Sequence, residues 1–389
     1  MRVDEIKGHL GKDIIPFWKG LKDDEFGGFY GEMDFDLNLC KKADKGCILN
    51  SRILWFFSNA YMTLGEEDHL LYAKHAYDFL KDSFYDQECG GVFWSVTYDG
   101  RPSDDTKHTY NQAFAVYGLA SYYGVSKDKE ALALAYTLVD KIETLCKDDI
   151  GYLESFDRYF GPASNEKLSE NGIMASRTMN TLLHILEAYT ELYRVDQKKA
   201  IADKIRQLLD LFADKVYNPA ERRLEVFFDY EMNSILDLNS YGHDIEASWL
   251  VDRSVEILED PAYEAKITPI TRELVAHIHS VAMDETSLYN EAEKGVVDTK
   301  KVWWVQAEAM LGFLNGYQKD PTKKEYLESV AKIWDFTKTY MIDHREGSEW
   351  FFELQKDGTP IDREIVGPWK CPYHNGRMCF EVINRKVAF

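Results

Sequence analysis

The sequence lacks the patterns that mark several large classes of protein. None of its six cysteines forms a CxxC pair or part of a dense framework, which favours a reduced intracellular protein over a disulfide scaffold. No stretch approaches the roughly 18 uncharged apolar residues of a membrane span, and the N-terminus shows no signal-peptide pattern. We therefore expect a cytoplasmic protein with no membrane association.

Positive charge is also scarce. Against 67 aspartates and glutamates there are 46 lysines and arginines, so the net charge is −21, and no basic run occurs. Binding to a phosphate backbone needs clustered positive charge, so we do not expect nucleic acid as a partner. The sequence also contains no GxxxxGK[ST], GxGxxG or GxSxG motif, which leaves nucleotide cofactors and a serine-hydrolase mechanism without support.

What the sequence does contain is a repeat of about 60 to 70 residues, roughly one sixth of the chain. Short segments rich in glycine and aromatic residues recur at this spacing, and they are typical of hairpins or extended loops. These segments begin at Phe26, Cys89, Gly151, Arg222, Ser287 and Ser348. The period predicts an array of six similar units.

Between these segments lie two kinds of helical pattern. Amphipathic surface helices are predicted to begin at Leu70, Lys129, Lys198 and Lys323. Helices that are apolar on nearly every face, and therefore buried, are predicted to begin at Ser51, Asn111, Asn180, His243, Trp303 and His374. Six inner helices alternating with about six outer ones predict an all-α (α/α)6 barrel, in preference to an open solenoid. No linker divides the chain, so we expect one domain over residues 1–389.

Polar and aromatic residues gather near the N-terminal ends of the six buried helices. Parallel inner helices would bring these ends to one mouth, and a buried polar residue is more informative than a buried leucine. Adjacent Trp303 and Trp304 diverge by about 100° on a helix, so we expect Trp304 in the cavity and Trp303 in the core. The predicted site at this mouth contains Arg52, Tyr110, Asn180, His184, His243, Glu246, Trp304, Glu308 and His374.

These residue types predict acid–base chemistry on a carbohydrate. Histidines suit proton transfer near pH 7, indoles stack on the apolar faces of sugar rings, and Arg, Asn and Glu bond hydroxyls. Three histidines and two carboxylates could also hold a metal ion, but the compact spacings typical of zinc sites are absent, so we expect none. Two further classes stay open, namely a glycoside hydrolase that uses Glu246 or Glu308 and a sugar-binding protein without chemistry.

Six stretches become specific when they are taken together. They are Ser51-Arg52, YNQAF at Tyr110, MNTLLHILEAY with Asn180 and His184, HDIEASW at His243, VWWVQAEAM with Trp304 and Glu308, and GPWKCPYHNGR with Trp369 and His374. Over essentially the whole chain they resemble the N-acylglucosamine 2-epimerase family. The resemblance implies an (α/α)6 barrel that inverts C2 of the reducing-end glucose in β-1,4-linked disaccharides, turning cellobiose into glucosyl-mannose and lactose into epilactose. N-acylglucosamine epimerisation and aldose–ketose isomerisation remain alternatives within the same fold.

The resemblance also implies a role for each residue. After the sugar ring opens, one histidine removes the C2 proton to give an enediolate, and a second returns a proton to the other face. By position these are His243 and His374, in an order that the sequence leaves open. Glu246 would orient His243. Glu308 would act in the same way on the other histidine, and Arg52 would stabilise the enediolate oxygen.

The remaining members of the set would bind sugar. They are His184, Asn180 and Tyr110 at the reacting ring, Trp304 as its positioning residue, Trp249 as a wall behind His243, and Trp369 under the second ring. No cofactor or metal is required, because no net electrons move. The expected partner is a small carbohydrate, and the sequence leaves the oligomeric state open.

Overall fold

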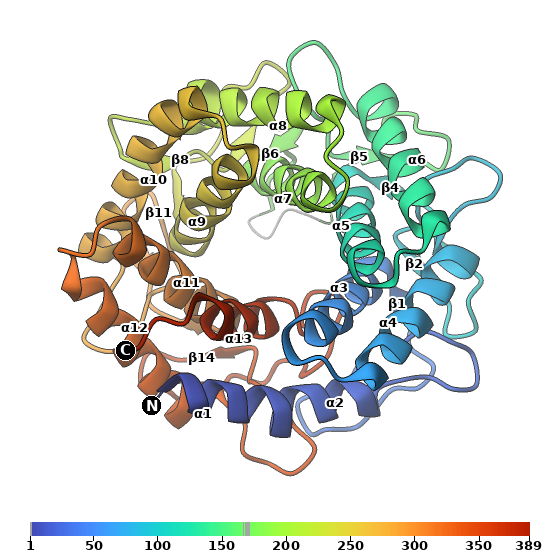
Figure 1. Cartoon of the computed structure of the whole chain (residues 1–389), viewed down its shortest axis with the longest axis horizontal. Coiled ribbons are helices and arrows are strands. Elements are labelled where there is room, and N and C mark those ends of the chain that lie inside the picture. The colour runs from blue at the N-terminus through green and yellow to red at the C-terminus, as the bar shows by residue number, and fades with distance from the viewer. Residues whose placement is uncertain (1, 166, 168–171) are drawn as a thin grey trace.

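The computed structural model describes residues 2–165, 167 and 172–389, which form two concentric rings of helices (Figure 1). The inner ring contains α3 (Cys47–Leu64), α5 (Thr109–Ser126), α7 (Met179–Val195), α9 (Tyr241–Leu258), α11 (Trp303–Lys319) and α13 (His374–Arg385). The outer ring contains α1 (Arg2–His9), α2 (Ile15–Gly20), α4 (Glu67–Phe79), α6 (Lys129–Leu145), α8 (Lys199–Leu211), α10 (Pro261–Val281) and α12 (Lys324–Phe336). Each inner helix packs against the next, and α13 packs against α3. The ring is closed, so the predicted (α/α)6 barrel is confirmed.

Two parts of the outer ring have no clear sequence pattern. Helix α10 carries Pro269 in its interior, and α1 is joined to α2 through a π-helical turn, η1 (Leu10–Ile14), that contains Gly11. Proline lacks a backbone N–H and glycine weakens a helix, so both residues interrupt the periodicity on which a prediction depends. Three other outer helices end in π-helical turns, which are η2 (Leu80–Phe84), η3 (Phe212–Val216) and η4 (Thr337–Met341).

Short antiparallel strands connect the two rings, as the glycine- and aromatic-rich segments predict. The paired strands are β1 (Lys45–Gly46) with β2 (Ser95–Val96) and β3 (Pro102–Asp104), β4 (Lys107–His108) with β5 (Ser155–Phe156), β6 (Arg177–Thr178) with β9 (Phe227–Phe228), β7 (Tyr217–Asn218) with β8 (Arg223–Leu224), β10 (Leu238–Ser240) with β11 (Glu291–Glu293) and β12 (Val296–Asp298), and β13 (Lys301–Val302) with β14 (Glu353–Leu354). Strands β1, β4, β6, β10 and β13 each end directly before an inner helix. The inner helices therefore begin on the same side of the barrel.

Buried ion pairs fix where several inner helices begin. A lysine two residues before the helix pairs with an aspartate in the turn that follows the preceding outer helix. The pairs are Lys45–Asp23 at 2.6 Å, Lys107–Asp86 at 3.1 Å and Lys301–Asp284 at 2.6 Å. One oxygen of each aspartate accepts backbone N–H groups of its own turn and the other contacts the lysine, so both carboxylate oxygens have partners. These pairs hold the helix starts at the level of the mouth.

The inner helices also approach one another closely. A Cβ atom at Gly118 of α5 would lie 2.7 Å from the carbonyl oxygen of Ser51 in α3, so this contact requires glycine. Although the inner helices are strongly apolar, none of the helices in the described part of the chain is both long and apolar enough to span a membrane.

Candidate active site

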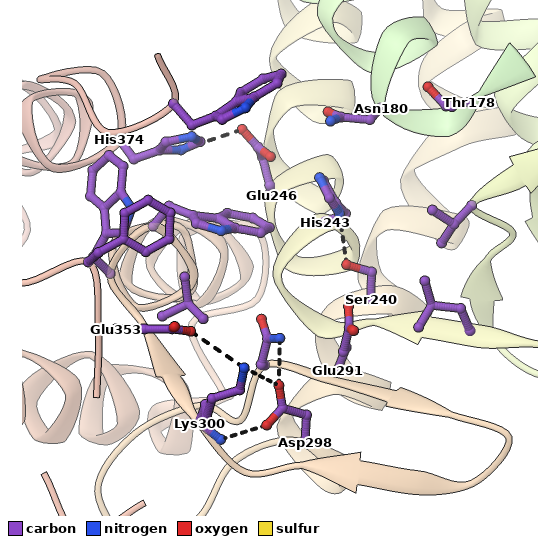
Figure 2. Close-up of a pocket in the computed structure, with 18 of the residues that line it drawn as sticks. Thr178, Asn180, Ser240, His243, Glu246, Glu291, Asp298, Lys300, Glu353 and His374 are labelled. Atoms are coloured by element: carbon purple, nitrogen blue, oxygen red, sulfur yellow. Dashed lines mark hydrogen bonds and ion pairs between the residues drawn. The ribbon is translucent and has the colours of Figure 1, made fainter. Parts of the chain in front are cut away.

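A cavity of about 470 Å³ lies at the N-terminal ends of the inner helices (Figure 2). Residues from all six of these helices line it. The positive ends of six helix dipoles converge there, which favours negative charge inside the cavity. The predicted residues that line it are Arg52, Tyr110, Asn180, His184, His243, Glu246, Trp304, Trp369 and His374. Trp303 also reaches the wall but is only 1% exposed. Segments far apart in the sequence thus meet in one chamber.

His374 is held from below by Glu308. Its Nδ1 lies 2.7 Å from Glu308 Oε1, and the other carboxylate oxygen accepts the indole N–H of Trp249 at 2.9 Å. Burial, with nearby Arg377 adding to it, lowers the pKa of His374 well below its usual value, so the ring is neutral at pH 7. A carboxylate can only accept, so the single ring proton is on Nδ1, and Nε2 carries a lone pair.

The predicted position of Trp249 is wrong. It is expected as a wall behind His243, but its indole is 1% exposed and bonds Glu308 beneath the cavity. On α9, Trp249 lies almost one helical turn beyond Glu246, and therefore farther from the N-terminal end of the helix at which the cavity lies. Trp249 supports a carboxylate.

The predicted partner of His243 is also wrong. The Nδ1 of His243 lies 2.7 Å from Oγ of Ser240, the last residue of β10, rather than beside Glu246 (Figure 2). Glu246 Oε1 instead contacts Arg377 at 2.5 Å and lies 3.9 Å from Nδ1 of His374. Burial lowers the pKa of His243 to about 3, so this imidazole is neutral as well. The residue just before the helix, not the residue one turn on, orients the ring.

Both imidazoles lie against the same indole. The ring centroid of Trp304 is 4.8 Å from that of His243 and 5.5 Å from that of His374. Gly242 makes this arrangement possible, since a Cβ there would come within 2.4 Å of the Trp304 ring. The two histidines therefore face the same part of the cavity, as the predicted two-histidine site requires.

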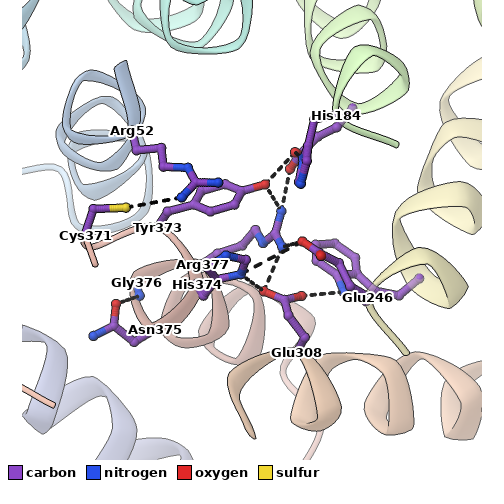
Figure 3. Close-up of polar contacts among 12 residues, drawn as sticks. Arg52, His184, Glu246, Glu308, Cys371, Tyr373, His374, Asn375, Gly376 and Arg377 are labelled. Atoms are coloured by element: carbon purple, nitrogen blue, oxygen red, sulfur yellow. Dashed lines mark hydrogen bonds and ion pairs between the residues drawn. The ribbon is translucent and has the colours of Figure 1, made fainter. Parts of the chain in front are cut away.

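Arg377 joins the carboxylates beneath the cavity (Figure 3). Its guanidinium contacts Glu187 at 2.5 Å, Glu246 at 2.5 Å and Glu308 at 2.7 Å. Neither Arg377 nor Glu187 belongs to the predicted site. Helical spacing could have found both, because each lies three residues after a predicted histidine, Arg377 after His374 and Glu187 after His184.

One guanidinium among three buried carboxylates gives them different proton affinities. Burial opposes ionisation of Glu187, but Arg377, His184 and Tyr373 outweigh it and bring its pKa to about 2. Burial and the nearby Glu308 raise the pKa of Glu246 to about 7, although Arg377 opposes this. Burial also raises the pKa of Glu308, so Glu187 is the member of this group that is held most firmly in its ionised form, and Glu246 changes its protonation near neutral pH.

Two further side chains of the cavity are fixed by their partners. His184 Nδ1 lies 2.9 Å from Glu187 Oε2, which also accepts the hydroxyl of Tyr373 at 2.5 Å. Arg52 donates to the hydroxyl of Tyr110 at 2.8 Å. Both contacts leave polar groups of His184 and Arg52 at the wall of the cavity, as expected for residues that bind a polar ligand.

The outer part of the cavity is formed by strands and loops. Trp369 lies there with its ring 6.0 Å from that of Trp94. Lys300 reaches Asp298 and Glu353, each at 3.5 Å, across the mouth (Figure 2). Trp369 belongs to the predicted site, but pattern analysis of helices could not select Asp298, Lys300 and Glu353, because they lie in short strands and connections with no periodic signal. The rim extends the cavity beyond the histidines.

Glu246, Glu308 and His374 lie close enough together to share a metal ion. However, Nη2 of Arg377 contacts both Glu246 and Glu308, at 2.5 and 2.7 Å. A guanidinium already supplies the positive charge there, so a divalent cation would be repelled from the same oxygens. The donor set does not fit a metal.

Three comparisons identify similar proteins. The pattern of the N-acylglucosamine 2-epimerase (GlcNAc 2-epimerase) family matches residues 28–376. A cellobiose 2-epimerase of Ruminococcus albus is 52% identical over 388 residues, which cover 100% of both chains. The crystal structure of a sugar epimerase from a ruminal bacterium has 50% identity, 100% coverage of both chains and a TM-score of 0.99. The cellobiose 2-epimerase of Bacillus thermoamylovorans B4167 has 47% identity over 98% of this chain and 99% of that one, with a TM-score of 0.95.

Proposed function

The chain belongs to the N-acylglucosamine 2-epimerase family, and on this basis we propose that it inverts C2 of the reducing-end glucose in β-1,4-linked disaccharides such as cellobiose and lactose. Relatives that carry the name cellobiose 2-epimerase match it over their full length, which supports a disaccharide substrate. The observation that carries the mechanism is the contact of two neutral imidazoles, His243 and His374, with one indole in one cavity.

The reaction starts from the open-chain sugar, whose aldehyde at C1 makes the C2 proton acidic. For one epimer, Nε2 of His374 takes this proton, and the electron pair of the C–H bond moves through C1 to its oxygen, giving an enediolate. Rotation about the C2–C3 bond turns the other face of C2 toward His243. As the charge of the enediolate develops, His243 takes up a proton from solvent, and its Nε2 gives this proton to C2, which forms the new C–H bond and restores the aldehyde. His243 is then neutral again, and His374 releases the proton that it removed to solvent. In the reverse direction the two histidines exchange roles.

The enediolate is stabilised by positive charge at the wall of the cavity, namely Arg52 and the N-terminal ends of the inner helices. Arg52 lines the cavity and keeps its geometry through Tyr110 and through cation–π contacts with Phe114 at 4.1 Å and Tyr373 at 4.6 Å. Donors that are fixed before the reaction cost no reorganisation when charge develops, and this contribution is often the largest in such barriers. The helix N-termini around the cavity act in the same direction.

The second sugar of the substrate lies toward the rim in this proposal. Trp369 offers an apolar face there, and Lys300, Asp298 and Glu353 supply donors and acceptors for hydroxyls. His184 and Asn180 lie deeper and bond the hydroxyls of the reacting ring. The disaccharide thus enters with its reducing end toward the histidines.

Incubation with cellobiose in D₂O tests the proposal. Glucosyl-mannose should accumulate with deuterium at C2, because the proton passes through histidines that exchange with solvent. NMR of the product reports both the epimer and the label. Epimerised product that carries hydrogen at C2 would contradict proton abstraction.

The same assay separates the alternatives of the family. Lactose, mannose and N-acetylglucosamine are tested beside cellobiose, and conversion of the two disaccharides should be the fastest. Fructose-type products would indicate an aldose–ketose isomerase, and a preference for N-acetylglucosamine would indicate the other epimerase. Release of monosaccharides would indicate a hydrolase. The structure disfavours this reaction, because Glu246 and Glu308 contact the same nitrogen of Arg377 and so do not lie on opposite sides of a glycosidic bond.

The turnover number kcat is expected to rise with pH through about 7. Glu246 has a pKa of about 7, raised first by burial and then by Glu308, so it is neutral below this pH and ionised above it. Ionised Glu246 lies 3.9 Å from Nδ1 of His374 and makes this base stronger. The profile of kcat from about pH 5.5 to 9 should lose this limb in Glu246→Gln. A limb of the same height and midpoint in the variant would show that another group titrates.

A further inference from the structure

Arg377 lies beneath the floor of the substrate cavity. It is 1% exposed and contacts carboxylates from three inner helices, namely Glu187 of α7, Glu246 of α9 and Glu308 of α11 (Figure 3). Arg377 lines a second cavity of about 50 Å³ among the middle and C-terminal parts of the inner helices, and it does not line the substrate cavity. Arg377 is therefore separated from the sugar by the side chains that it holds.

Two of the three carboxylates each hold a histidine of the substrate cavity. Glu187 contacts Nδ1 of His184 at 2.9 Å, and Glu308 contacts Nδ1 of His374 at 2.7 Å. Both oxygens of each carboxylate accept a donor: Arg377 and the Tyr373 hydroxyl at Glu187, and Arg377 and the Trp249 indole at Glu308. A protonated carboxyl would have to donate from one of its oxygens, so these contacts require the ionised form. Carboxylates this close together repel one another and raise one another's pKa, so a cation beside them favours their ionised forms. Arg377 is in that position.

Other charged and titratable groups surround Arg377 without replacing it. The ring of Tyr373 contacts both Arg377, at 4.1 Å from its centroid, and Arg52 of α3, at 4.6 Å. Tyr117 of α5 also faces this network. The guanidinium of Arg52 donates to Tyr110 and Cys371. The guanidinium that contacts the three carboxylates is that of Arg377.

We propose that Arg377 is a positioning residue that keeps Glu187 and Glu308 ionised and aligned, so that His184 and His374 both hold their proton on Nδ1 and present Nε2 to the sugar. Its kinetic effect rests on the proposed function, but the tautomers themselves do not depend on it. One buried guanidinium would thus set the state of two histidines on different helices.

The kinetic test compares Arg377→Lys with Arg253→Lys. Arg253 lines the same small cavity but pairs with Glu381 at 2.6 Å, so it is a matched control. A lysine cannot reproduce the planar contacts to three carboxylates. We expect kcat of Arg377→Lys on cellobiose to fall about 100-fold with KM changed by less than about threefold, since misplacement of about 1 Å has such an effect.

The pH profile and chemical rescue separate positioning from a structural role. Loss of the cation raises the pKa of the carboxylates, so the acidic limb of kcat should move up by at least about one pH unit in Arg377→Ala. Methylguanidinium should restore activity to Arg377→Ala, and urea at the same concentration should not. The proposal would be overturned if the variants lost kcat only as far as they lost thermal stability, if the acidic limb of the kcat–pH profile stayed in place, and if methylguanidinium restored no activity.

A spectroscopic readout tests the inference apart from the activity. In wild type labelled with ¹⁵N-histidine, the ring nitrogens of His184 and His374 should show the Nδ1–H form, assigned from His184→Asn and His374→Asn. If wild type fails to convert any sugar, the proposed function is wrong while this result still stands. Finding either ring as the Nε2–H form in wild type would overturn the role of Arg377, whether or not its variants fold.

Discussion

Alanine at position 374 or 243 is expected to abolish epimerisation while each variant still exchanges the C2 hydrogen of one epimer with solvent. Each histidine removes the proton from one face of C2, so loss of one base leaves the other able to act on its own epimer. His374→Ala should therefore label one of cellobiose and glucosyl-mannose in D₂O, and His243→Ala should label the other. Which epimer belongs to which histidine then follows directly from the experiment.

The expected loss of epimerisation is about 10²–10⁴-fold or more for either variant, because a positioned acid or base supplies that much. His344→Ala is the matched control, since His344 is exposed and contacts the backbone oxygen of Lys338. Its rate should equal that of wild type. Epimerisation within about tenfold of wild type in His374→Ala or His243→Ala would remove that histidine from the mechanism. Label in both epimers with a single variant would show that one base serves both faces.

The sequence predicts the barrel well because its signal is repeated. Six apolar helices starting near Ser51, Asn111, Asn180, His243, Trp303 and His374 are each found in the inner ring, within four residues of the predicted start. The outer ring is less readable, since α10 and the α1–α2 pair carry proline or glycine where a regular pattern is needed. Repetition compensates for such gaps, because six units imply a partner for every inner helix.

The sequence predicts which residues meet at the site, but not which of them form hydrogen bonds with one another. The ends of parallel helices meet at one mouth, so His184, His243 and His374 can be placed together from spacing alone. The hydrogen bonds among them depend on which side chain of a neighbouring helix lies at the same depth, and local spacing carries no such information. The resemblance assigns Glu246 to His243, and the helical spacing of the two residues gives no reason to doubt this assignment, whereas the contact of His243 is with Ser240.

Glu308→Gln is expected to lower kcat by about 100-fold or more, as loss of a carboxylate that orients a functional histidine commonly does. Three donors converge on this carboxylate, namely the Nδ1–H of His374, the indole N–H of Trp249 and Nη2 of Arg377. An amide has one oxygen to accept and an NH₂ group that only donates. In the variant, either His374 or Trp249 must face a donor, so the ring of His374 loses its fixed tautomer or its position.

A double-mutant cycle with Trp249→Phe identifies this cause. Phenylalanine removes the indole N–H, so the amide introduced by Glu308→Gln can turn its NH₂ toward the new phenyl ring and its oxygen toward His374. The double variant should therefore lose less activity than the product of the two single losses, with a coupling of about 1 kcal/mol or more. Trp303→Phe is the control, because Trp303 contacts His374 directly, with ring centroids 5.3 Å apart, and not through Glu308. If the losses of Glu308→Gln and Trp249→Phe simply multiply, the carboxylate acts through its charge rather than through the number of donors that it accepts.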